Sequence, residues 1–162
     1  FDEHKIIIKN INKNLFSNYK IDLSKYPLIT EKNDTVFLKH FSTKYILLYF
    51  FTSWCRPCIK ELTAINEIYP QIKDSLEIIV ISADRIPLNY YYFTKEYNFP
   101  NLGVYYFNQN YELLEQLKIV VFPQSILIDK SGNIINATMP DIKNGLIEYL
   151  FNIAKTDLPG KY

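Results

Sequence analysis

The stretch from 45 to 51, Tyr-Ile-Leu-Leu-Tyr-Phe-Phe, constrains the fold more than any other, because none of its side chains is charged. With polar Thr52 and Ser53 directly after it, the stretch predicts a β-strand that is buried on both faces. Apolar residues then recur at three- and four-residue steps, as in an amphipathic helix: Ile59, Leu62, Ile65, Ile68, Tyr69 and Ile72. A buried strand that leads directly into a helix favours an α/β protein with parallel strands.

The rest of the chain continues the alternation of strands and helices. Further strands are predicted at 35–38, 76–81, 102–107, 125–129 and 133–138, and further helices at 87–98, 110–116 and 141–155. Asn110 is expected to cap the helix that follows it, and Lys130-Ser131-Gly132 is a hairpin signal. The order from residue 45, β-α-β-α-β-α-β-β-α, predicts a mixed central β-sheet flanked by helices.

The two ends of the chain fall outside this pattern. Residues 1–32 are rich in Asn and Lys, with β-branched bursts at 6–8 and at Ile21, and are expected to form an N-terminal β extension. The predicted main domain covers 33–156, and 157–162 form a tail. The chain begins at Phe rather than Met, so we expect residues upstream, where a signal or a membrane tether has its place.

Composition excludes several classes of function. The 162 residues contain 18 Lys and Arg against 17 Asp and Glu, so a basic surface for nucleic acid is not expected. With only 4 Gly, neither glycine-rich phosphate-binding motif occurs. The 2 Cys are too few for a disulfide-stapled miniprotein, so their position becomes the first question.

The two cysteines, Cys55 and Cys58, lie where the buried strand ends and the helix begins. Free N–H groups and a partial positive charge at a helix start stabilise a thiolate, and Arg56 adds a formal charge. Pro57 suits the first helical turn, because its missing N–H has no partner there. A spacing of three brings the two Cα atoms to about 5–6 Å, within reach of a disulfide. We therefore expect Cys55 to be the exposed nucleophile and Cys58 the less exposed resolving cysteine.

Three other interpretations of the pair are open. Zinc needs two further ligands, and the only His residues are His4 and His40, so no metal site is expected. A static disulfide across so short a loop would contribute little stability. The pair could also be two buried thiols without a redox role.

These residues resemble a known family. The stretch 50–62, Phe-Phe-Thr-Ser-Trp-Cys-Arg-Pro-Cys-Ile-Lys-Glu-Leu, is similar to the active site of thioredoxin-fold proteins, and more narrowly of the TlpA/ResA-like thiol-disulfide oxidoreductases of bacterial cell envelopes. The segment 33–47, which precedes the buried strand and includes its start, also resembles the TlpA/ResA-like proteins. The stretch 121–132 is similar to the family's cis-proline loop, strand and turn. The resemblance covers about 33–155 and implies a thioredoxin-like fold.

The resemblance implies roles for individual residues. Cys55 is the attacking cysteine, Cys58 resolves the mixed disulfide, and Pro123 is a cis-proline that faces them. The backbone of Phe122 pairs with an extended substrate segment. Trp54 covers the site, and Arg56 and Pro57 complete the surface that a substrate meets.

Two positions depart from the family pattern. Many thioredoxins place a buried Asp six residues before the first cysteine, where this chain has Tyr49, a poor base at pH 7. Glu61, three residues after Cys58 on the same helix face, is a candidate substitute, and ResA-like members carry a carboxylate there too. The alternative is that Glu61 is an ordinary solvated residue near the helix start. Phe122 is bulkier than the family's usual residue, which favours a packing role over a change in the substrate groove.

The function expected from these observations is thiol-disulfide exchange with protein substrates, in the reducing direction, with an upstream electron donor. The redox-active disulfide is the only redox group expected, without a bound cofactor, and the expected location is the periplasm or cell envelope. A thiol peroxidase of the AhpC/TSA group is an alternative, although Leu48 occupies its Pro position while Thr52 fits. A non-enzymatic interaction module of a larger exported protein is another.

Overall fold

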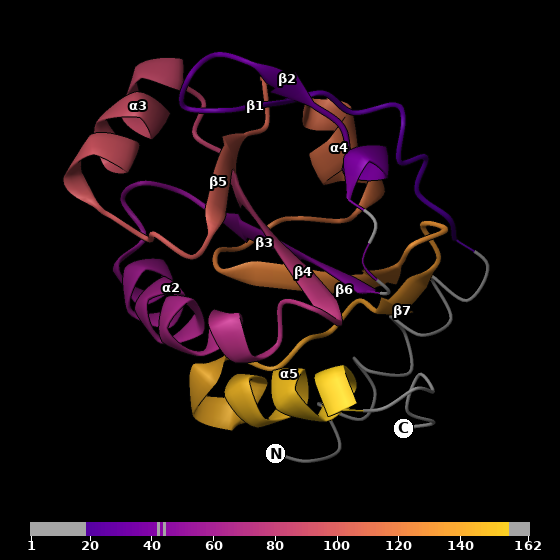
Figure 1. Cartoon of the computed structure of the whole chain (residues 1–162). Helices are drawn as coiled ribbons and strands as arrows, with labels where there is room; N and C mark the ends of the chain where they lie inside the picture. Colours follow the sequence, from indigo (N-terminus) through magenta and orange to yellow (C-terminus); the bar gives the residue numbers. More distant parts are fainter. Residues whose placement is uncertain (1–18, 42, 44, 156–162) are drawn as a thin grey trace.

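A seven-stranded mixed β-sheet forms the centre of the molecule, with helices on both of its faces (Figure 1). The computed structural model describes residues 19–41, 43 and 45–155. The strand order is β2-β1-β5-β4-β3-β6-β7. The strands are β1 (Leu28–Ile29), β2 (Thr35–Val36), β3 (Tyr45–Phe51), β4 (Leu76–Ser82), β5 (Gly103–Tyr106), β6 (Gln124–Asp129) and β7 (Ile134–Asn136). The predicted fold class is confirmed.

Strand β3 lies in the interior of the sheet, parallel to β4 on one side and antiparallel to β6 on the other. All of its side chains are buried, as the apolar run predicts. Those at odd positions join a core cluster with α2 (Arg56–Ile68) and α5 (Leu146–Lys155). Those at even positions face the opposite cluster, with α4 (Tyr111–Gln116) and the segment that precedes β3. The two clusters hold the carboxyl end of β3 rigidly, where the cysteines follow.

Helix α2 ends earlier than its apolar pattern predicts. The α-helix stops at Ile68, and a 3₁₀ helix, Tyr69–Gln71, continues the apolar face. Pro70 has no N–H, so the carbonyl of Asn66 has no partner within the helix. The side chain of Asn101 donates to that carbonyl instead, at 2.9 Å.

The last predicted helix is also divided. A 3₁₀ helix, Ile142–Asn144, precedes α5, and Gly145 between them has a φ of 97°. An α-helix cannot pass through a left-handed residue, which is why the turn at 141–145 forms a separate element. The Asp141 carboxylate caps the 3₁₀ helix by accepting from the Asn144 N–H at 2.9 Å.

The N-terminal region differs from the sequence prediction in its details. The strand of the predicted β extension that joins the sheet is β1, which lies outside both β-branched bursts. The predicted strand at 35–38 shortens to β2 because Leu38 starts a 3₁₀ helix, Leu38–His40. At Ile21 no strand forms, and its neighbour Lys20 makes only an isolated bridge to Asn133. The burst at 6–8 lies outside the described residues.

The remaining helices match their predicted positions closely. Helix α3 spans Pro87–Glu96, and α4 begins directly after Asn110, which is its N-cap residue as predicted, although the Asn110 side chain makes no capping hydrogen bond. Of the helices in the described ranges, none combines the length and the apolar character needed to cross a membrane.

Candidate active site

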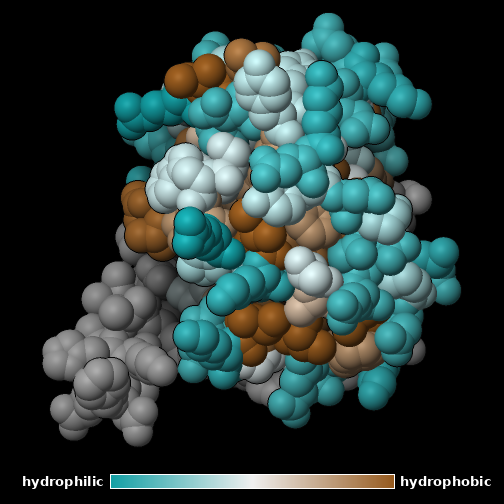
Figure 2. All heavy atoms as spheres, turned by 90° about the vertical axis from the view of Figure 1, so that its left-hand side faces the viewer, coloured by the Kyte–Doolittle hydropathy of each residue, from teal (hydrophilic) through white to brown (hydrophobic). Residues whose placement is uncertain are grey.

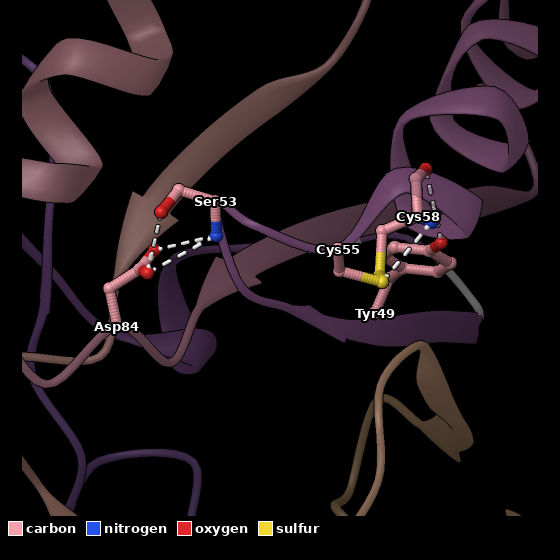
Figure 3. The surroundings of a disulfide bond; sticks show 5 residues. All are labelled: Tyr49, Ser53, Cys55, Cys58 and Asp84. Carbon is pink, nitrogen blue, oxygen red and sulfur yellow. Dashed lines mark hydrogen bonds between the residues drawn. A yellow bond between two sulfur atoms is a disulfide. The ribbon is translucent and has the colours of Figure 1, made fainter.

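Cys55 and Cys58 form a disulfide bond at the start of α2, with their Cα atoms 5.3 Å apart (Figure 3). Cys55 occupies the position before the first helical residue, and Pro57 lies in the first turn, as expected. The Sγ atom of Cys55 accepts the backbone N–H of Cys58 at 3.3 Å. This N–H and the helix dipole would stabilise a Cys55 thiolate once the disulfide opens.

The exposure of the two cysteines differs from the prediction in one respect. Cys58 is 0% exposed and Cys55 only 4%, so the expectation of an exposed Cys55 is wrong for the disulfide form. Trp54 projects outward with 73% exposure, and Arg56 and Pro57 are exposed as well.

The loop before β6 contains the predicted cis peptide bond, Phe122–Pro123, and its Phe122 packs against the core cluster that includes both cysteines. Gln124 holds the loop from within: its side-chain oxygen accepts from Val120 N, and its side-chain nitrogen donates to Lys118 O, each at 3.1 Å. The ring of Phe122 meets the Trp54 ring edge to face, with their centroids 6.5 Å apart. This contact places the proline loop against the turn that leads into Cys55.

Phe122 also packs against both core clusters, which agrees with the packing role expected for it. Its bulk therefore connects three parts of the site: the core, the proline loop and Trp54. An aromatic ring can do this where a smaller side chain would leave the contact unmade.

Glu61 is buried, with 4% exposure, so the alternative of a solvated side chain is wrong. Burial raises the pKa of its carboxyl. The N–H of Ile142, at 3.0 Å, and the hydroxyl of Tyr49 hydrogen-bond to the carboxylate and oppose this rise, while nearby Asp141 adds to it. A carboxyl whose pKa is raised binds a proton more strongly than a solvated one, which suits it to accept a proton from a neighbouring group.

Tyr49 links Glu61 to the cysteine pair. Its hydroxyl hydrogen-bonds to Glu61 and also donates to the carbonyl of Cys58 at 3.5 Å. Burial raises the pKa of Tyr49 well above its usual value, so the phenol stays protonated and acts as a donor. The residue in the place of the thioredoxin Asp thus contacts the carboxyl that we consider its substitute.

Asp84 is a second buried carboxylate near the cysteines, and no role was expected for it from the sequence. It binds the backbone and side chain of Ser53, two residues before Cys55 (Figure 3). Only its place at the carboxyl end of a strand in an α/β sheet could have indicated it.

One hollow of about 390 Å³ lies away from the disulfide, between the end of α3, β5 and the loop at 30–34. Figure 2 views the side of the molecule that carries α2 and α3, where apolar patches are bordered by hydrophilic side chains. Of the described residues that line the hollow, none is a predicted site residue. Nor do three or more His, Cys, Asp or Glu gather as a metal site anywhere in the described ranges.

Comparison with known proteins agrees with this geometry. A family model described as thioredoxin-like matches residues 43–134, more than half of the chain. The chain belongs to the thioredoxin-like family. Within it, this chain is a TlpA/ResA-like thiol-disulfide oxidoreductase, as similarity to the ResA proteins indicates. The thiol-disulfide oxidoreductase ResA of Bacillus thuringiensis subsp. konkukian is 35% identical over 120 residues, which are 72% of this chain and 67% of ResA.

One further relative supports the assignment, and one solved structure supports the fold. ResA of Geobacillus thermodenitrificans is 31% identical over 67% of this thioredoxin-like chain and 65% of its own length. The solved thioredoxin domain of a thiol-disulfide oxidoreductase from Bacteroides vulgatus superposes with a TM-score of 0.69 at 24% identity, covering 85% of this chain and 99% of that domain. The second match supports the fold alone.

Proposed function

We propose that this oxidoreductase reduces disulfide bonds of protein substrates, with Cys55 as nucleophile and Cys58 as resolving cysteine. The observation that carries the proposal is the position of Cys55 Sγ at the start of α2, where it accepts the Cys58 N–H and forms a disulfide with Cys58. Thiolate stabilisation and a partner within bonding distance are the two requirements of a dithiol that opens and closes.

In the first step, the Cys55 thiolate attacks one sulfur of a substrate disulfide. The substrate S–S bond breaks, a new bond forms between Cys55 and the attacked sulfur, and the other substrate sulfur leaves as a thiolate that takes a proton from water. Arg56 adds positive charge beside the nucleophile, which favours the thiolate.

In the second step, Cys58 attacks Cys55 Sγ and releases the second substrate thiolate. Cys58 is fully buried, so its thiol needs a base within the protein. Glu61, one helical turn later on the same face, accepts the proton. Tyr49 hydrogen-bonds to Glu61 and to the backbone carbonyl of Cys58, and so positions the carboxyl beside this turn of α2. Two electrons have then passed to the substrate, and the Cys55–Cys58 disulfide remains.

The substrate segment lies beside Pro123, extended along the backbone of Phe122. Trp54 and the exposed Val120 and Val121 supply apolar contacts on either side of this path, and Pro57 borders it. An extended segment suits this place because the loop offers backbone groups for pairing, and the apolar rim accommodates side chains around the target cysteine.

The cycle closes when an upstream dithiol donor reduces the Cys55–Cys58 disulfide again, so no bound cofactor is needed. The similarity to TlpA/ResA-like proteins supports an extracytoplasmic location, in the periplasm or cell envelope.

Insulin reduction with dithiothreitol tests the proposal. We expect the native chain to accelerate precipitation of the insulin B chain, and Cys55→Ser to be inactive. Cys58→Ser should retain the first step and accumulate substrates as mixed disulfides on Cys55, visible on a non-reducing gel. A native chain that gives no acceleration over dithiothreitol alone would overturn the proposed function.

A further inference from the structure

The carboxylate of Asp84 is buried at the carboxyl end of β4, with 2% exposure. The backbone N–H of Ser53 donates to both of its oxygens, at 3.1 and 3.0 Å, and the Ser53 hydroxyl donates to Oδ1 at 2.8 Å. The hydroxyl of Ser82 donates to Oδ2 at 2.7 Å. Hydrogen bonds to an ionised carboxylate are stronger than those between neutral groups. Figure 3 shows the carboxylate and Ser53 facing one another.

Ser53, which Asp84 binds, belongs to the turn that ends at Cys55. The N–H of Cys55 donates to Thr52 O at 3.0 Å, so Thr52–Cys55 is a tight turn with Ser53 as its second residue. Asp84 is itself held beside the end of β3, since its neighbour Ala83 donates a backbone hydrogen bond to Phe51 O at 2.8 Å. The carboxylate therefore joins two strand ends to the turn before the nucleophile.

We infer that Asp84 is a positioning residue for thiol-disulfide exchange, which holds the Thr52–Cys55 turn so that Cys55 stays at the helix start while the disulfide is open. The inference rests on the proposed dithiol chemistry. In the disulfide form, the S–S bond itself fixes Cys55. In the dithiol form that bond is gone, and the turn with its anchor must keep the sulfur near Cys58.

This role has a consequence for the redox equilibrium. A turn without its anchor samples more conformations in the dithiol form, so closing the disulfide loses more conformational entropy. Removing Asp84 should therefore shift the equilibrium toward the dithiol. A merely structural role would lower the stability of the whole fold and leave the dithiol-disulfide equilibrium unchanged.

Equilibration with glutathione measures the shift directly. Oxidised glutathione takes two electrons from the dithiol, which yields the Cys55–Cys58 disulfide, two molecules of reduced glutathione and no other product. We expect Asp84→Asn to lower this equilibrium constant about tenfold, as the loss of charge-assisted hydrogen bonds implies. Ser53→Ala, which removes only the hydroxyl donor and leaves the charge in place, should lower it about threefold.

Asp129→Asn is the matched control. The Asp129 carboxylate also holds a turn, accepting from Ser131 N, Asn133 N and the Asn133 side chain at 2.8–3.0 Å, but it does so in the hairpin after β6. This variant should be destabilised, yet its glutathione equilibrium should stay within about twofold of the native value.

A folded Asp84→Asn whose equilibrium constant stays within about twofold of the native value overturns the inference. If Asp84→Asn does not fold, the same criterion applies to Ser53→Ala, which leaves the buried carboxylate in place: an unchanged equilibrium constant overturns the inference. The assay is independent of the proposed function: a native chain that equilibrates with glutathione but does not reduce insulin would contradict the function alone.

Discussion

The backbone N–H of Ile142 donates a hydrogen bond of 3.0 Å to Oε2 of Glu61, although the two residues are 81 positions apart. This bond joins the helix that starts at the cysteines to the turn ahead of α5. It stabilises the charged form of a carboxyl whose burial favours the neutral form. The two effects oppose each other, and burial is the larger, so the Glu61 pKa is raised.

The first prediction concerns the rate of disulfide closure. If Glu61 accepts the proton of Cys58, then closure in the native chain accelerates as pH rises through the Glu61 pKa, which burial raises. Glu61→Gln should lose this dependence and react about a hundredfold more slowly at neutral pH. Stopped-flow fluorescence can follow the step, because Trp54, the only Trp, is next to Cys55.

Glu77→Gln is the control for this experiment. Burial raises the pKa of Glu77 too, and its carboxyl hydrogen-bonds to Tyr69, but it lies near the opposite end of β4 from the cysteines. Its closure rate should match the native one at every pH. Equal rate profiles for Glu61→Gln and the native chain would remove Glu61 from the mechanism.

A second prediction concerns stability against pH. The Glu61 pKa is raised in the folded state, so the folded protein holds this proton to higher pH than the unfolded chain does. The stabilisation is complete below the unfolded pKa of about 4.3 and is lost as pH rises through the folded pKa. The Glu61→Gln variant has no carboxyl at this position to lose a proton, so its stability does not fall in this way. The unfolding free energy of the variant minus that of the native disulfide form should therefore increase from acid to alkaline pH. Urea unfolding at both ends of this range measures the difference, and a constant difference would contradict the raised pKa.

Tyr49→Phe tests the link between the strand and Glu61. The Tyr49 hydroxyl lowers the Glu61 pKa, so its removal should raise that pKa further and move the rate profile of disulfide closure to higher pH. The rate at high pH should be retained, because the carboxylate is still present. Tyr69→Phe removes a similar hydroxyl from Glu77 and should leave the profile unchanged. An unshifted profile in Tyr49→Phe would show that its hydroxyl does not influence Glu61.

The central strand and the cysteine-bearing helix could be predicted because their signals are local. Burial on both faces requires an unbroken apolar run, and the helical stripe begins within a few residues of its end. The position of strand β1 within the N-terminal extension could not be predicted: it has only two residues, and its pairing with Tyr106 depends on a distant segment. Short strands take their stability from such neighbours rather than from their own sequence.

The same difference between local signals and long-range contacts applies to the site. The spacing of Cys55 and Cys58 and their place at a helix start are local features, so the pair could be identified from sequence alone. The partners of Glu61 and of Ser53 are brought in by the fold, across 81 and 31 positions. Periodic sequence patterns do not indicate such long-range contacts, so only the structure shows that Glu61 is buried and that Asp84 binds the turn before Cys55.

The last prediction compares two glycines with positive φ. Gly132, at 89°, ends the hairpin turn after β6, and a Cβ there would lie 2.2 Å from the backbone oxygen of Ile21. Gly145, at 97°, has no atom within 4 Å of the same position. Gly145→Ala should therefore lower the unfolding free energy by about 1 kcal/mol, the conformational term alone.

Gly132→Ala adds a steric clash to the same conformational term. It should lower the unfolding free energy by about 3 kcal/mol, because the backbone of Ile21 must move and its N–H hydrogen bond to Gly132 O, 2.9 Å long, is weakened. Urea unfolding of both variants measures the difference. Since neither glycine lies at the disulfide, folded samples of both should reduce insulin at the native rate. Equal losses of stability in the two variants would show that the segment around Ile21 yields freely to the new side chain.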